Sequence, residues 1–88
     1  MPEPFRLNWS DGALTYLEQL VERAPGQAAA VVNAMDWLAA SGFALGPEVR
    51  PGTRYWPVPP QGVYYTARGR YLSVVRVVDV RRRRSTHP

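Results

Sequence analysis

The chain has 88 residues, of which 45% are hydrophobic and 20% are charged, and its formal net charge is +4 at pH 7. These values exclude a disordered tail and predict one folded domain with a thin core. The absence of cysteine excludes disulfides, thiolate catalysis and most structural zinc sites. Because there is neither an apolar run of about 18 residues nor a signal-peptide pattern, we expect a soluble, cytoplasmic protein without a membrane partner.

All eleven basic residues are arginine, and the chain contains no lysine. Arginine is permanently charged and holds phosphate in a bidentate fork, but it is a poor general base. The arginines therefore favour an anionic ligand, and the phosphates of RNA or DNA are the expected one. Codon bias in a GC-rich genome is the alternative explanation for this composition.

The N-terminal segment is typical of a strand followed by a helix. Residues 5–9 alternate apolar and polar side chains, which indicates a half-buried strand. Ser10 and Asp11 then supply an N-cap and a first-turn acid, and both favour the start of a helix. Apolar residues recur at helical spacing from Ala13 to Ala24, so we expect a helix over this segment.

A second helix follows after a break at Pro25 and Gly26. It carries apolar residues at helical spacing from Ala28 to Ala39, and Gly42 is typical of a C-terminal cap. The link between the two helices is too short for any arrangement other than an antiparallel hairpin.

The second half of the chain predicts a loop and then three strands. Residues 43–51 read as an irregular loop, residues 53–58 as a short strand, and residues 59–62 as a turn rich in proline. β-Branched and aromatic residues lie on both sides of residues 67–70, where Gly69 permits the positive φ of a tight hairpin turn.

The last strand is apolar on both of its expected faces. Alternation places Leu72, Val74, Val78 and Val80 on one face, and Tyr71, Val75 and Val77 on the other. This pattern is typical of a central strand covered on both sides. The helical hairpin can cover one face, and the other face requires a partner or forms a working concave surface. The fold class is therefore α+β, with elements in the order β-α-α-β-β-β.

In this order and spacing, the residues resemble the toxins of bacterial type II toxin–antitoxin systems, the RelE/ParE superfamily. The resemblance covers nearly the whole chain and rests on the opening strand, on the helical hairpin, and on the residues Trp9, Ser10, Asp11, Ala13, Val63, Tyr64, Tyr65, 74–78, Arg81, Arg82 and Arg83. It implies one toxin domain over residues 1–88, with residues 81–88 as a basic C-terminal tail. It also implies a small twisted antiparallel sheet packed against the α-helical hairpin, with a basic concave face.

The resemblance further implies a cognate antitoxin, whose tail wraps the toxin in a hetero-oligomer and neutralises it. RelE-like members cleave mRNA in the ribosomal A site, whereas ParE-like members inhibit DNA gyrase without being nucleases. The chain departs from the RelE-like pattern at Gln61 and Gly62, where a basic residue is usual, and Arg54 is the only basic residue near the usual strand-two lysines. We expect a ribosome-dependent mRNA endonuclease that inhibits translation. The alternatives are a ParE-like gyrase inhibitor and a non-toxic member that binds an antitoxin or RNA.

Cleavage of RNA without a metal needs a base on the 2′-hydroxyl, an acid on the leaving oxygen and cations on the phosphoryl oxygens. We take Arg82, Arg83, His87 and Glu48 as candidate catalytic residues. His87 is the only histidine and is either the acid or part of a mobile terminus. Glu48 is either the base or a solvated loop residue. No metal or cofactor is expected, because no ligand cluster or phosphate-binding glycine loop is visible.

The candidate nucleic-acid-binding residues are Arg54, Arg68, Arg70, Arg76, Arg81, Arg84 and Tyr64. Arg76 interrupts an apolar strand face, where an unpaired charge would be costly. Either that face is open to solvent and phosphate, or Arg76 pairs with an acid. The candidate acids are Asp79, Glu18 and Asp36. We expect Tyr64 to point outward, where it can stack on bases, and Tyr65 to point into the core. Residues 81–84 are alternatively a solvated basic tail that raises non-specific affinity for nucleic acid.

Overall fold

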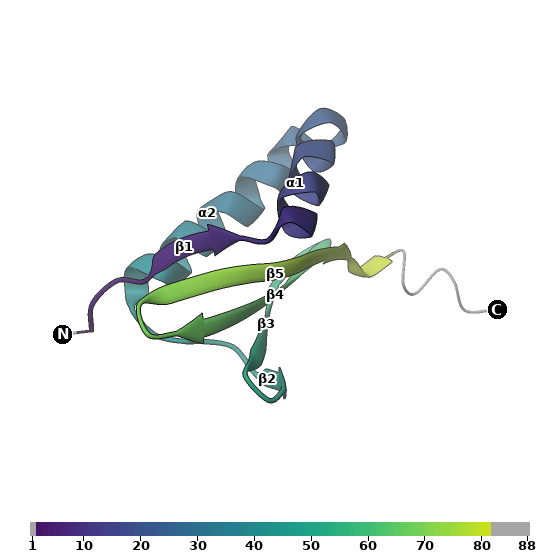
Figure 1. Cartoon of the computed structure of the whole chain (residues 1–88). Helices are drawn as coiled ribbons and strands as arrows, with labels where there is room; N and C mark the ends of the chain where they lie inside the picture. The colour runs from purple at the N-terminus through teal and green to yellow at the C-terminus, as the bar shows by residue number, and fades with distance from the viewer. Residues whose placement is uncertain (1, 82–88) are drawn as a thin grey trace.

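A computed structural model of the chain describes residues 2–81, and in it two helices pack on one face of a five-stranded sheet (Figure 1). The strand order across the sheet is β1-β5-β4-β3-β2. In chain order the elements are β1 (Arg6–Trp9), α1 (Asp11–Arg23), α2 (Pro25–Ser41), β2 (Glu48–Arg50), β3 (Thr53–Val58), β4 (Gln61–Arg68) and β5 (Tyr71–Asp79). The predicted α+β class is confirmed.

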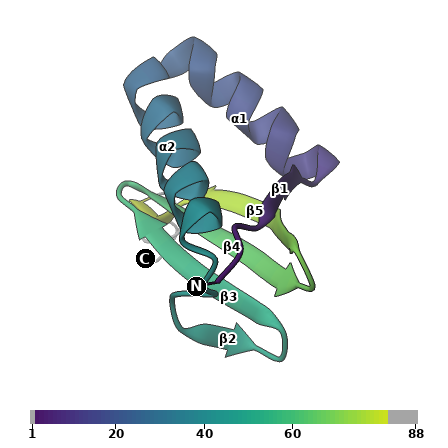
Figure 2. The ribbon, with the colours of Figure 1, turned by 90° about the vertical axis from the view of Figure 1, so that its left-hand side faces the viewer.

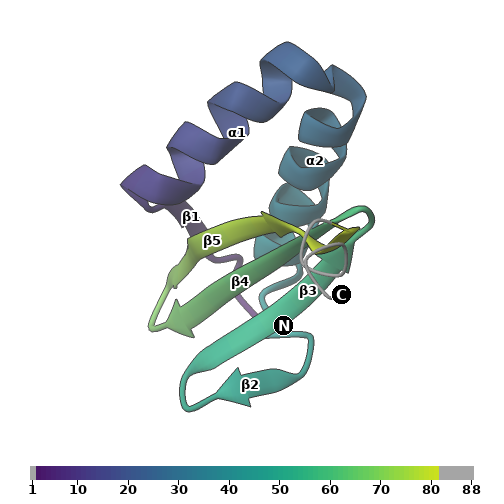
Figure 3. The ribbon, with the colours of Figure 1, turned by 90° about the vertical axis from the view of Figure 1, so that its right-hand side faces the viewer.

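The two helices begin and end where local sequence signals place them. The Ser10 hydroxyl accepts a hydrogen bond from the backbone N–H of Ala13 at 3.1 Å and so caps α1. Pro25 occupies the first turn of α2, directly after the Ala24 cap of α1, and Gly42 is the C-cap of α2. The predicted helical hairpin is confirmed, and its arms diverge from Ala24 as an inverted V above the sheet (Figures 2 and 3).

The sheet is mixed, so the expectation of a wholly antiparallel sheet needs one correction. β1 lies at the edge and pairs with β5 in parallel, whereas β5, β4, β3 and β2 pair antiparallel in succession. Parallel neighbours require a long connection, and here residues 10–70 lie between the two strands. The predicted β4–β5 hairpin is confirmed, with Gly69 at φ 56° in its turn.

Two predicted boundaries are wrong. Residues 48–50, expected within a loop, form β2 because they pair with the start of β3. Gln61 and Gly62, expected within a turn, are the first two residues of β4, and both are buried. In each case the strand is fixed by its partner across the sheet, since neither segment shows an apolar alternation of its own.

A β-bulge interrupts the register between β4 and β5. Tyr64 pairs with Arg76 and Tyr65 pairs with Val74, so Val75 is an extra residue on the β5 side. One extra residue exchanges the two faces of a strand from that point onward. The alternation of β5 is therefore reversed beyond Val75.

The bulge decides which residues of β5 reach the core. Leu72 is fully buried before it, and beyond it Val77 and Asp79 are buried while Val78 is half-buried. The prediction that Val78 and Val80 share a face with Leu72 is wrong for this reason. An unbroken alternation would also have turned Arg76 toward the helices, whereas the bulge turns this charge away from the core.

The core fills the space between the helices and the sheet. Its largest fully buried apolar side chains are Tyr65, Leu20, Met35, Leu38 and Leu72. Tyr65 faces inward as predicted, and its hydroxyl has no hydrogen-bond partner among residues 2–81. Burial raises the pKa of Tyr65, and the positive charge of Arg54 offsets part of that rise.

A polar network joins both helices to β4 at one end of the core. The Tyr16 hydroxyl of α1 donates to Oε1 of Gln61 at 2.7 Å, and Nε2 of Gln61 donates to Oε1 of Gln27 in α2 at 2.9 Å. The Arg23 guanidinium donates to the Tyr16 oxygen at 3.0 Å. Because Gln61 is only 1% exposed, its amide requires these partners. The departure from the RelE-like pattern at Gln61 therefore lies on the side of the sheet that faces the helices.

Two Tyr→Phe substitutions should differ in their effect on stability. Tyr16→Phe leaves the buried amide oxygen of Gln61 without its donor, so the free energy of unfolding should fall by about 1–2 kcal/mol. Tyr65→Phe removes a hydroxyl that has no partner in the described part of the chain, so stability should be unchanged or slightly higher. Urea unfolding followed by tryptophan fluorescence measures both, and equal losses would contradict the assignment of the network.

Tyr65 should also make stability depend on pH in the alkaline range. Its pKa is raised in the folded protein, so the unfolded chain releases the proton near the ordinary tyrosine pKa of about 10 while the folded chain retains it. The stability that this group contributes is complete below about pH 10 and is lost as the pH rises through the raised pKa. Urea midpoints of the wild type should fall above about pH 10 more steeply than those of Tyr65→Phe. Parallel pH profiles would contradict this cause.

Candidate functional site

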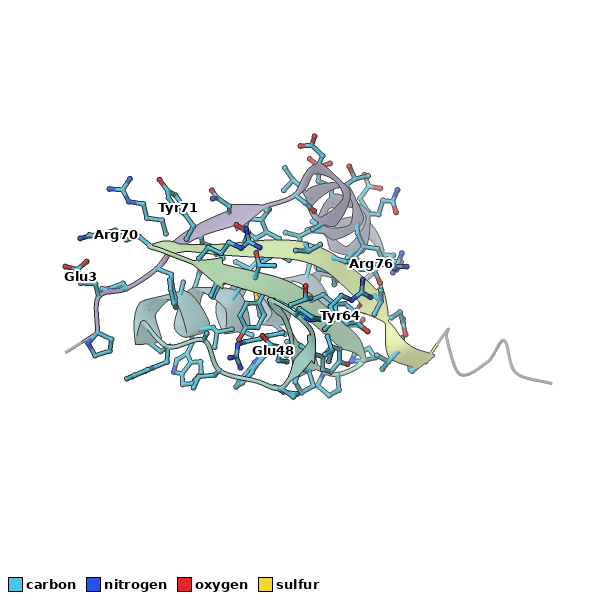
Figure 4. All side chains as sticks on the ribbon, turned by 60° about the horizontal axis from the view of Figure 1, so that its bottom comes forward. Glu3, Glu48, Tyr64, Arg70, Tyr71 and Arg76 are labelled. Carbon is cyan, nitrogen blue, oxygen red and sulfur yellow. The ribbon has the colours of Figure 1, made fainter. Side chains whose placement is uncertain are left out.

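One face of the sheet carries the helices, and the opposite face, which we call the open face, turns toward the viewer in Figure 4. The cross-strand register arranges its side chains in rows. In order along the strands, these rows are Arg6, Tyr71 and Arg68; Asn8, Ser73, Thr66 and Thr53; Arg76, Tyr64 and Tyr55; and Val78, Gly62 and Pro57. The open face is therefore mostly polar, and the prediction of an apolar second face is wrong.

The rows contain arginines and no carboxylate. Arg6, Arg68 and Arg76 are all exposed, and the exposed Arg50 lies opposite Thr53 at the margin of the sheet. The guanidinium of Arg68 lies beside Gly52 in the β2–β3 turn. Its Nη2 atom is 3.9 Å from the point where a side chain at residue 52 would begin. Arginines without intervening acids give the open face a positive potential that attracts anions.

A groove of about 950 Å³ crosses the open face. Its lining extends from Arg50 and Thr53 through Tyr64 to residues 75–79, and it includes Tyr16 of α1. The groove therefore connects the β2 margin of the sheet to the start of the helical layer. Arg76 and Tyr64 lie side by side in it, on neighbouring strands (Figure 4).

Two tyrosines form an aromatic pair on this face. The rings of Tyr55 and Tyr64 have centroids 5.2 Å apart and planes inclined by 59°. The Tyr55 ring lies over Gly62, where any Cβ would collide with it, so glycine is what allows this ring to approach β4. Tyr64 points outward, as predicted, and Tyr55 supports it from the neighbouring strand.

Arg76 lies on the open face and is exposed to solvent. Within residues 2–81, ion pairs join Arg70 to Glu3 and Arg81 to Asp79, and none involves Arg76. Of the two alternatives drawn from the sequence, the structure thus favours the open face over an acid partner.

Three other arginines of the predicted nucleic-acid-binding set have structural contacts elsewhere. Arg70 lies in the β4–β5 turn and pairs with Glu3 at 2.7 Å, far along the sheet from Arg76 (Figure 4). Arg54 donates to the backbone oxygen of Gly46, in the loop before β2, at 2.7 Å. Arg81 donates to both carboxylate oxygens of Asp79, at 3.4 and 3.2 Å. The open face therefore brings together Arg68, Arg76 and Tyr64 from that set, and Arg84 lies outside the described residues.

The predicted catalytic residues are not brought together in the described part of the chain. Glu48 lies in β2, and its Oε2 accepts a hydrogen bond from the backbone N–H of Gly52 at 3.1 Å, which closes the β2–β3 turn. Arg82, Arg83 and His87 lie outside the described residues. Within residues 2–81 there is no group of three His, Cys, Asp or Glu side chains that could hold a metal ion. No helix in the same segment is long and apolar enough to span a membrane.

The sequence analysis missed two arginines of this face. Arg6 could have been found, because the alternation of residues 5–9 already separates it from the apolar side of its strand. Arg50 could not, because its position depends on the irregular pairing of β2 with β3. Asn8 and the hydroxyl residues of the second row carry no local signal that distinguishes them from ordinary strand residues.

The residues that line the groove include a buried acid, Asp79. Asp79 is only 9% exposed and accepts hydrogen bonds from both the backbone N–H and the guanidinium of Arg81. This hydrogen bonding to Asp79 raises the pKa of Arg81 further. The pair holds the chain where β5 ends, so Arg81 has an ion pair that Arg76 lacks within residues 2–81.

No family model and no curated protein sequence matches the chain. Among solved structures, its fold is similar to that of a chain from the chromosomal ParDE toxin–antitoxin system of P. aeruginosa. The TM-score is 0.68 at 20% sequence identity, and the match covers 85% of this chain and 95% of that chain. At this identity the likeness establishes the fold alone, and the expected RelE/ParE-like fold is confirmed.

Arg81 and Arg76 should respond differently to the same substitution. Arg81→Gln removes the guanidinium partner of a buried carboxylate, so the urea midpoint should fall. Arg76→Gln removes an exposed charge, so the midpoint should remain that of the wild type. Equal midpoints in the two variants would contradict the structural role of the Asp79–Arg81 pair.

Proposed function

We propose that this chain is the toxin of a type II toxin–antitoxin pair in the cytoplasm and that it acts by binding its target, as ParE-like toxins do when they inhibit DNA gyrase. The support is the fold shared with the ParDE chain over 95% of that chain's length, together with the resemblance carried by the sequence motifs. Fold alone does not determine activity, so the mode of action has to be argued from the open face.

The observation that carries the binding mode is the chemistry of the open face. Its rows offer guanidinium, phenol, hydroxyl and amide groups. The carboxylate that lines the groove, Asp79, is only 9% exposed and accepts hydrogen bonds from Arg81. Cleavage by acid–base catalysis needs both a base and an acid within hydrogen-bond reach of the reacting atoms. Arginine cannot act as that base, and the predicted base Glu48 is bound to a turn. The described face is therefore suited to holding a charged partner.

α1 offers a surface for the antitoxin. Leu14 and Val21 lie two turns apart on the same side of the helix and are 44% and 52% exposed. Exposed apolar residues at this spacing are typical of a face on which another chain docks. We assign this face of α1 to the cognate antitoxin in a hetero-oligomer.

Ribosome-dependent cleavage of mRNA is the second candidate function. It is favoured by the combination of arginines and tyrosines on the open face, which suits RNA as well as DNA. In this case Arg82 and Arg83 would neutralise the phosphoryl oxygens, and His87 would be the acid on the leaving oxygen. All three lie outside the described residues.

Induction of the chain in a bacterium without the antitoxin distinguishes these functions. For a gyrase-type toxin, growth should stop with DNA breaks and an SOS response, while primer extension finds cellular mRNAs intact. Arg76→Gln should weaken the arrest, and Arg70→Gln, which removes the same charge from the β4–β5 turn far from Arg76, should leave it unchanged.

Two outcomes would contradict the binding mode. New cuts at codon-spaced positions in translated frames would replace it with mRNA cleavage. Unimpeded growth at a verified protein level would identify a non-toxic member that only binds an antitoxin or RNA.

A further inference from the structure

We propose that β2 is the interface of a homodimer, in which it pairs antiparallel with β2 of a second copy across a two-fold axis at Val49. The sheet ends at β2, and no strand among residues 2–81 pairs with the outer side of this strand (Figure 2). An edge strand presents a row of backbone N–H and C=O groups to which another strand can pair. The inference rests on this edge of the sheet and does not depend on the proposed function.

The charges of β2 are ordered so that the strand complements itself. β2 consists of Glu48, Val49 and Arg50, and all three residues are exposed. In an antiparallel pair centred on Val49, each Glu48 lies opposite Arg50 of the second copy, and the two valines face each other. Opposite charges on facing residues stabilise such a pair, and the two-fold axis forms both ion pairs at once.

The same charges disfavour the other ways of pairing two copies of β2. A parallel pair in register would place Glu48 beside Glu48 and Arg50 beside Arg50, and like charges directly opposite are destabilising. A shift of the antiparallel pair by one residue would place Val49 opposite a charge and leave the second charge without its partner. Charged residues often protect an edge from pairing, but in this order they permit one register.

Val49 is the residue of β2 that is available at the outer side. It is 48% exposed, and the irregular register pairs Glu48 with Arg54 and Arg50 with Thr53, so Val49 has no partner residue in β3. A β-branched residue that faces its own copy across the axis would bury apolar surface on both chains. This position therefore suits the centre of a strand pair.

An exposed aromatic surface lies beside this edge, on the helix side of the sheet. Trp56 of β3 lies opposite the buried Val63, and Trp37 of α2 stacks on it with ring centroids 6.0 Å apart. Gly46, in the loop that leads to β2, lies against the Trp56 ring. Trp37 is 57% exposed, and Phe43 in the same loop is 55% exposed. Large apolar side chains exposed together mark an interaction surface.

Pairing of β2 would bring the aromatic surfaces of the two copies close together. Neighbouring strands are about 4.8 Å apart, so the two copies of β3 would lie about 14 Å apart, on either side of the paired strands. Three-residue strands alone bury too little area for a stable dimer, whereas each large aromatic side chain can bury about 150–250 Å². Trp37 and Phe43 would therefore supply much of the apolar contact.

A strand of another protein is the main competing occupant of this edge. It would need a base and an acid at the same spacing and in the complementary order, which a second copy supplies by symmetry. The dimer would also change the groove, because Arg50 lines it at the β2 margin. In the dimer, Glu48 of the second copy would lie beside this arginine, so each groove would end at a residue from the other chain.

Sedimentation equilibrium of the purified full chain tests the dimer. The mass of one chain is 9.9 kDa, and we expect the measured mass to rise toward twice this value from low micromolar to submillimolar concentration. Trp37→Gln should raise the dissociation constant about tenfold or more, because large aromatic residues carry much of the energy of an interface. Urea midpoints show whether each variant is folded.

Charge reversals on β2 test the pairing itself. Glu48→Arg and Arg50→Glu each place like charges opposite one another, so each variant alone should dimerise about tenfold more weakly or less. An equimolar mixture of the two variants should dimerise as tightly as the wild type, since every facing pair again has opposite charges. Arg6→Glu makes the same reversal on β1, at the opposite edge of the sheet, and should dimerise as the wild type does.

The mixture separates pairing from folding. Glu48 also accepts a hydrogen bond from the backbone of Gly52, so Glu48→Arg could weaken the turn within its own chain. Such a loss would persist when the second variant is added, whereas a contact across the axis would be restored. Recovery in the mixture therefore supports the proposed pair.

Several results would overturn the proposal. A mass of one chain at every concentration would leave this edge to solvent or to a strand of another protein. Dimers that withstand both reversals on β2, or that Arg6→Glu disrupts equally, would move the interface to another surface. Failure of the mixture to recover would show that the reversals act within one chain and not across the pair.

Discussion

The bulge at Val75 is the constraint on which the two faces of the sheet depend. The apolar residues of β5 do not keep one alternation, and a straight strand would place Arg76 on the same face as Leu72 and Val74. A charge buried there would be costly, because the core offers it no water. With one extra residue in the strand, Val77 enters the core and Arg76 reaches solvent. The same irregularity thus completes the core and creates the central cation of the open face.

The bulge has a second consequence, because it also turns Asp79 to the buried side. That carboxylate is tolerated since Arg81 donates to it from both its backbone and its guanidinium. On the same side, the Gln61 amide is satisfied by Tyr16 and Gln27. The polar groups that face the helices thus stabilise the fold. The arginines of the open face form no ion pair within residues 2–81. The sheet separates structural charges from charges that are available to a partner.

This separation bears on activity. The fold that the chain shares with a ParDE protein is compatible with more than one activity, so the groups on the open face carry the functional argument. Guanidinium groups form bidentate pairs with anions, and arginine is a poor general base.

The sequence by itself determined the helices, their caps, the β3 strand, the β4–β5 turn and the inward direction of Tyr65. Each of these depends on contacts between residues close together in the chain, or on simple alternation. The parallel edge strand, β2, the bulge and the choice of which arginines remain exposed were decided by the tertiary structure. They depend on pairing between strands that are distant in sequence, as β1 and β5 are. A one-residue change in that pairing reverses every side chain beyond it, and no local pattern records where it occurs.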